Sequence, residues 1–142
     1  MKKSKSLVAF FFFLLASSAI AFAAQAVPAN PVPGMPVLLT YVIDGNGSFN
    51  PDRVQTLTVN LVDKDGKAAP SGFDLQGFDA RMPEHQHGMA TKAVIQKKSN
   101  AEYIVSGVKL HMPGKWVLEF KVSDKVSKVS STVSVKVPVE IK

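Results

Sequence analysis

The stretch from Val129 to Lys142 reads V-S-S-T-V-S-V-K-V-P-V-E-I-K, and it decides the fold class of this chain. Apart from Ser131, every odd position from 129 to 141 holds Val or Ile, and most even positions are polar. Because successive side chains of a strand point to opposite faces, this pattern predicts a β-strand with one buried and one solvent-exposed face. Pro138 lacks a backbone donor, so we expect this strand to lie at a sheet edge.

The same alternation recurs along most of the preceding chain. It predicts further strands at residues 37–43, 54–62, 73–82, 89–97, 102–108 and 116–122. The alternation changes phase near Gly77, where we expect a β-bulge. Asp- and Gly-rich connections follow the first two of these strands and favour turns. About seven short strands with no helical periodicity predict an all-β, immunoglobulin-like β-sandwich.

The N-terminus has the three parts of a secretion signal. Lysines at positions 2, 3 and 5 precede the apolar run from Leu7 to Ala16, and Ala-x-Ala sites end at Ala23 and Ala26. We therefore expect a signal peptide over residues 1–26, cleaved near Ala23 or Ala26, and a periplasmic or secreted protein. An uncleaved anchor spanning Leu7 to Ala23 is the alternative.

Two segments follow the predicted signal peptide. Residues 27–36 contain four prolines and predict an extended lead-in with few hydrogen bonds. Residues 37–142 are long enough for one compact core, so we expect a single domain.

Charge and cysteine content narrow the possible functions. The formal net charge is +6, and removal of the three signal lysines leaves 14 basic against 11 acidic side chains, or +3. This balance does not indicate a nucleic-acid partner. The chain has no cysteine, so a site for a soft metal must use His and Met. Because no nucleophile motif accompanies a histidine, we do not expect an enzyme.

The first segment that could bind a metal is Met82-Pro83-Glu84-His85-Gln86-His87-Gly88-Met89. If it is extended, His85, His87 and Met89 project from the same side of the chain. The second segment runs from Gly107 to Trp116 and contains His111 and Met112 before Pro113-Gly114. The Pro-Gly pair predicts a type II turn with positive φ at the glycine. Met82 and Trp116 have core-facing phases, so we expect both to be packing residues.

Imidazole nitrogen and thioether sulfur together suit copper, and the thioether favours Cu(I). The candidate metal ligands are therefore His85, His87, Met89, His111 and Met112, with His85 and His87 expected to contribute most. Structural alternatives exist for each residue type. The first two histidines could face water at a strand end, His111 could bond a backbone carbonyl in a turn, and Met112 could pack in the core.

The two segments together resemble the YtkA-like family, a group of exported or membrane-anchored bacterial domains related in sequence style to FixH proteins. The resemblance covers about residues 35 to 125. It rests on the Met-Pro-x-His-x-His-Gly motif that begins at Met82 and on the Met-Pro-Gly-x-Trp turn that begins at Met112. It implies an immunoglobulin-like β-sandwich and a link to copper handling or to assembly of copper-containing respiratory enzymes. His111 lies outside the matched pattern, so its role as a ligand depends on chemistry alone.

The sequence thus leaves two functional hypotheses. The first is a periplasmic copper-binding protein that acts as a chaperone, buffer or resistance factor, exchanging copper with a donor or acceptor protein. The second is a non-metal accessory domain that docks onto a membrane respiratory complex. Neither hypothesis requires stable membrane insertion once the signal peptide is cleaved.

Overall fold

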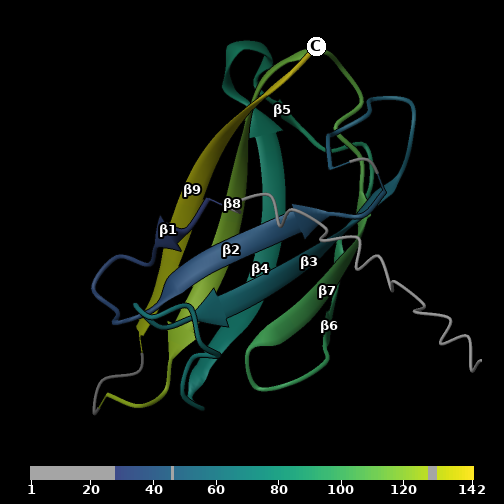
Figure 1. Ribbon diagram of the computed structural model, residues 1–142. Helices are drawn as coiled ribbons and strands as arrows, with labels where there is room; N and C mark the ends of the chain where they lie inside the picture. The colour runs from purple at the N-terminus through teal and green to yellow at the C-terminus, as the bar shows by residue number, and fades with distance from the viewer. Residues whose placement is uncertain (1–27, 46, 128–130) are drawn as a thin grey trace, which may run out of the picture.

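A computed structural model describes residues 28–45, 47–127 and 131–142, so the predicted signal peptide lies outside the described residues. Two antiparallel sheets pack face to face (Figure 1). The first contains, in spatial order, β1 (Asn30–Pro31), β2 (Leu38–Ile43), β3 (Gln55–Val62), β7 (Glu102–Val108) and β6 (Val94–Lys97). The second contains, in spatial order, β5 (His87–Gly88), β4 (Phe73–Met82), β8 (Gly114–Asp124) and β9 (Ser131–Ile141). The predicted all-β sandwich is confirmed. Within this described part, no helix is long and apolar enough to cross a membrane.

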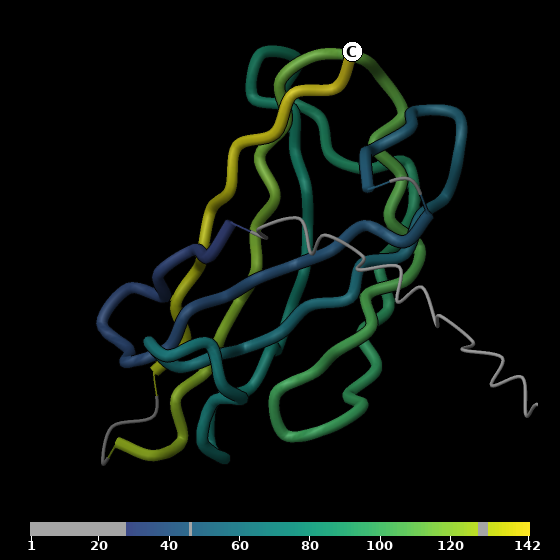
Figure 2. The backbone as a smooth tube through the Cα atoms, in the orientation of Figure 1, coloured from purple at the N-terminus to yellow at the C-terminus, as the bar shows by residue number. Residues whose placement is uncertain are grey.

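The strand order matches the constant-type immunoglobulin arrangement. Leaving aside the two-residue strands β1 and β5, seven strands remain, as predicted. In chain order, the first, second, fifth and fourth of these form one sheet, and the third, sixth and seventh form the other. This is the A-B-E-D and C-F-G grouping of immunoglobulin domains. The path of the chain between the two layers can be followed in Figure 2.

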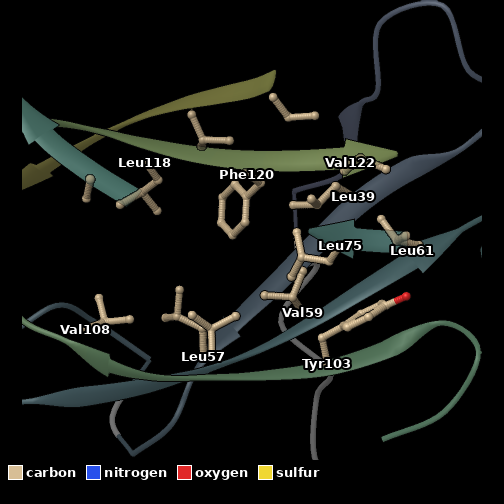
Figure 3. Close-up of a cluster of buried hydrophobic side chains, with 14 of the residues drawn as sticks. Leu39, Leu57, Val59, Leu61, Leu75, Tyr103, Val108, Leu118, Phe120 and Val122 are labelled. Carbon is tan, nitrogen blue, oxygen red and sulfur yellow. The ribbon is translucent and has the colours of Figure 1, made fainter. Parts of the chain in front are cut away.

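The core lies between the inner faces of the two sheets (Figure 3). Leu57 and Val59 of β3 and Phe120 of β8 are fully buried, as are many of their alternate neighbours. Trp116, the only tryptophan, is also fully buried, which confirms its predicted packing role. Because the chain has no disulfide, burial of these apolar side chains is the main stabilising contribution.

Several predicted boundaries agree with the structure. The strands over 73–82 and 102–108 are β4 and β7 without change, and a register shift between Leu75 and Gly77 confirms the predicted bulge. β9 lies at the edge of its sheet, as the position of Pro138 predicted.

Two predictions about local structure were wrong. The strand expected to begin at Met89 begins only at Val94. The proline-rich lead-in is also less isolated than expected, because Asn30 and Pro31 pair with β2. In addition, Val32 is buried, and its backbone N–H donates to the Val37 carbonyl at 3.1 Å. The lead-in is therefore part of the packed domain.

An ionic cluster around Asp74, near the beginning of β4, links the two sheets. Its carboxylate accepts hydrogen bonds from Lys97 of β6, from Tyr103 of β7 at 3.0 Å and from Lys125 at 3.0 Å. The hydrogen bond from Lys97, followed by that from Lys125, lowers the pKa of the Asp74 carboxyl from its ordinary 3.8 to about 2. Both stabilise the ionised form of the carboxyl.

This cluster predicts loss of stability in acid. Because the Asp74 pKa is lower in the folded protein than in the unfolded chain, its contribution is present above about pH 4 and is lost as the pH falls towards 2. We expect Asp74→Asn to lower the free energy of unfolding at pH 7 and to flatten its decline in this range. Urea unfolding at several pH values measures both effects. Asp65→Asn, which removes a carboxylate paired only with the exposed Lys64, serves as the control. A parental pH dependence in Asp74→Asn would contradict the assignment.

Candidate functional site

The candidate site lies at the opposite end of β4 from Asp74, where β5 and the start of β8 meet (Figure 1). β4 and β8 run antiparallel, with Arg81 opposite Val117. The residues that follow β4 and those that precede β8 therefore meet at one end of the sheet. These are the two histidine-containing segments.

The first segment is not extended, so the condition under which His85, His87 and Met89 would project from one side is not met. Pro83 to His85 form a short 3-10 helix, η1, and Gln86 then adopts a left-handed conformation with φ of 56°. Proline has a preset φ and lacks a backbone donor, so it fits the first turn of a helix. After this turn, His87 pairs with Met82, and the Met89 N–H donates to the Ala80 carbonyl at 3.2 Å. His87 and Met89 are thus held against β4, while His85 lies on the turn.

The three imidazoles nevertheless come together. The ring centroids of His85 and His87 are 5.7 Å apart, and those of His87 and His111 are 5.2 Å apart. His85 is exposed, whereas His87 and His111 are partly buried. The Nδ1 atoms of His87 and His111 are buried and have no hydrogen-bond partner among the described residues. Because buried polar atoms are nearly always paired, these two nitrogens mark the site.

Trp116 forms the inner wall of this cluster. Its ring lies 5.8 Å from that of His87 and 5.6 Å from that of His111, in both cases edge-on. Its indole N–H donates to the Met112 carbonyl at 2.9 Å. The same side chain therefore contacts both imidazoles and fixes the backbone next to His111. The alternation pattern predicted Trp116 only as a core residue. Its place two residues after the Pro-Gly pair was a signal that it lies close to the site.

The two candidate thioether ligands belong to the histidine segments and also contact the hydrophobic core. Met89 and Met112 are partly buried and pack against the hydrophobic core. Each is one or two residues from a histidine of the cluster, and a methionine side chain has three rotatable bonds. Within the described part of the chain, no three His, Asp or Glu side chains form a group that could hold a metal ion. The three predicted histidine rings are neighbours in the structure, and the two methionines pack against the hydrophobic core.

An apolar groove adjoins the cluster on the side of β9. It is lined by five apolar residues and three charged ones: Pro83, Trp116, Val117, Pro138, Val139, Glu84, Lys115 and Glu140. Pro83 and Trp116 belong to both features. A molecule lying in this groove would therefore contact the turn that carries His85.

Comparisons with known proteins identified no relative. No protein-family model matches the sequence, and no curated protein or solved structure matches it significantly. The resemblance to the YtkA-like family remains a prediction from the two motifs.

The turn into β8 predicts sensitivity at Gly114. The expected positive φ is confirmed at 125°, and a Cβ atom built there would clash with the terminal methyl carbon of Met82. Because both the backbone and the buried Met82 would have to adjust, we expect Gly114→Ala to destabilise the protein by about 1 to 3 kcal/mol. Thermal unfolding measures the loss. Gly66→Ala is the control, since Gly66 also has positive φ, 77°, but has nothing within 4 Å of its built Cβ. An equal loss in both variants would show that Met82 does not matter.

Trp116 gives a second prediction. Trp116→Ala should cost about 3 to 5 kcal/mol because it opens a large cavity in the core. Trp116→Phe keeps most of the apolar contact and removes the hydrogen bond to the Met112 carbonyl, so the expected loss is smaller, about 1 to 3 kcal/mol. Chemical denaturation compares the three proteins. A parental stability for Trp116→Ala would contradict the assigned packing.

Proposed function

We propose that this protein binds Cu(I) in a mixed imidazole and thioether site and serves as a copper chaperone, buffer or resistance factor. The observation that carries the proposal is the pair of buried, unpartnered Nδ1 atoms on the neighbouring rings of His87 and His111. A neutral imidazole has one nitrogen with a free lone pair, and this nitrogen can coordinate a metal ion. Two such rings from separate segments are the minimum for a two-coordinate Cu(I) site.

The chemistry of the available donors favours copper over harder ions. Calcium and magnesium prefer carboxylate and carbonyl oxygens, whereas imidazole and thioether are the donors that Cu(I) accepts. We assign His87 and His111 as the principal ligands and Met89 or Met112 as the thioether donors. His85 lies close enough to take part from the exposed side. This ligand set includes every residue that the sequence suggested and places most weight on the buried pair.

The cellular setting of the proposed function follows from the predicted signal peptide. Export would place the domain in the periplasm, where a donor or acceptor protein could exchange copper with it. The exposed position of His85, next to the partly buried pair, suits a site that is loaded and unloaded from the surface.

The apolar groove beside the site favours a second candidate function. A non-metal accessory domain could use Pro83, Pro138 and Val139 to dock onto a membrane respiratory complex. In this case the histidines would be surface and packing residues. Metal binding separates the two candidates, because only the copper-binding hypothesis requires it.

A Cu(I) competition titration tests the proposal. We expect one Cu(I) per chain, and at least about 100-fold weaker binding in His87→Ala/His111→Ala because both principal donors are lost. Met89→Ala/Met112→Ala should lose less affinity overall but more of its preference for Cu(I) over Cu(II). Met35→Ala is the control for this pair, since Met35 is another partly buried methionine that packs on the core. Unchanged binding in the double-histidine variant would contradict the copper site and favour the docking function.

A further inference from the structure

His85 differs from the other two histidines in its support and its exposure. His87 lies in β5 and pairs with Met82, and His111 contacts the fully buried Trp116. His85 is the last residue of η1, a three-residue turn whose N-terminal end has no side-chain cap. It is exposed to solvent, and its two ring nitrogens are not among the buried unpartnered atoms of the described residues.

The ring contacts place the three imidazoles in a row. His85 contacts His87 at 5.7 Å, and His87 contacts His111 at 5.2 Å. Exposure decreases from the first ring to the other two. A metal ion that arrives from solvent or from a partner therefore meets His85 before the partly buried pair, and a departing ion passes His85 last.

We propose that His85 is the exchange ligand of the site and that His87 and His111 are the resident ligands. This inference rests on the proposed function. During loading, a Cu(I)–nitrogen bond to His85 forms while one bond to the donor breaks. Bonds to His87 and His111 then form as the His85 bond and the last donor bond break. The ion stays Cu(I) throughout, so no electron is transferred, and unloading follows the reverse order.

This role has a kinetic consequence that differs from that of a resident ligand. An exchange ligand stabilises the transition state for both entry and exit, so its loss slows both rates by the same factor. The dissociation constant, which is the ratio of the two rates, then changes little. Loss of a resident ligand raises the dissociation constant, mainly through faster release.

Transfer of Cu(I) between the protein and a coloured Cu(I) chelator tests the proposal. The protein is purified from cells that express the full chain, and anaerobic stopped-flow absorbance of the chelator follows transfer in both directions. We expect His85→Asn to slow both directions about tenfold and to leave the dissociation constant within about threefold of the parent. His87→Asn should instead weaken binding at least about 100-fold.

The fluorescence of Trp116 gives a second readout of the same transfer. It is the only tryptophan and contacts both resident rings, so its emission should change when Cu(I) reaches them. In His85→Asn this change should be equally large and slower.

A control variant separates the His85 imidazole from the turn that carries it. Gln86→Asn introduces asparagine, which tolerates the left-handed conformation found at position 86. It leaves all three histidines in place. We expect parental exchange rates. Equal slowing in Gln86→Asn and His85→Asn would assign the effect to the turn and overturn the proposal.

Two further outcomes would overturn the exchange role while copper binding itself stands. If His85→Asn weakens binding as much as His87→Asn, then His85 is a resident ligand. If His85→Asn changes neither rate, then copper enters by another route. Absence of Cu(I) binding by the parent protein is a different result, because it would refute the proposed function together with the inference that rests on it.

Discussion

The antiparallel pairing of β4 with β8 is the constraint on which the candidate site depends. Residues at the end of one strand and at the beginning of its antiparallel neighbour must lie at the same sheet edge. The register that sets Arg81 opposite Val117 therefore brings the segment after β4 towards the segment before β8. Two short histidine segments that are separated in the chain become one cluster without any loop reaching across the molecule. Trp116 lies on β8 and is buried in the core, and it contacts the rings of His87 and His111 from the core side.

Strand β4 also separates the ionic cluster around Asp74 from the candidate site, because the two lie at opposite ends of it. Near its beginning, the Asp74 carboxylate links the two sheets, because it accepts hydrogen bonds from two lysines and a tyrosine hydroxyl. Beyond its other end, His87 and His111 have buried nitrogens with no partner in the described residues. A strand of ten residues is about 30 Å long, so the two features lie too far apart to share contacts. Changes at the histidine site can therefore be made with the ionic cluster left intact.

The sequence predicted the strands whose side chains alternate over many residues, because that periodicity reflects burial directly. β4, β7 and the bulge near Gly77 are examples. Prediction was weaker where a local turn overrides the pattern. Pro83 begins a short helix, and the sequence interpretation had considered only an extended chain there. The approach of His111 to His87 depends on the pairing of β4 with β8, which are distant in sequence. Only the shared donor chemistry of the two segments suggested it. No periodicity within either segment contains that information.

The Nδ1 atoms of His87 and His111, which have no partner among the described residues, carry a cost that the rest of the domain must offset. Leaving a buried polar atom without a hydrogen bond costs about 1 to 3 kcal/mol, and two such atoms at one position are a substantial local cost. A fold that tolerates this must gain its stability elsewhere, and the hydrophobic core between the two sheets supplies it. Natural proteins depart from local rules mainly at functional sites. On the proposed function, bound Cu(I) would satisfy these nitrogens and add its binding free energy to a domain that is already folded, so copper would stabilise the structure without being needed to form it.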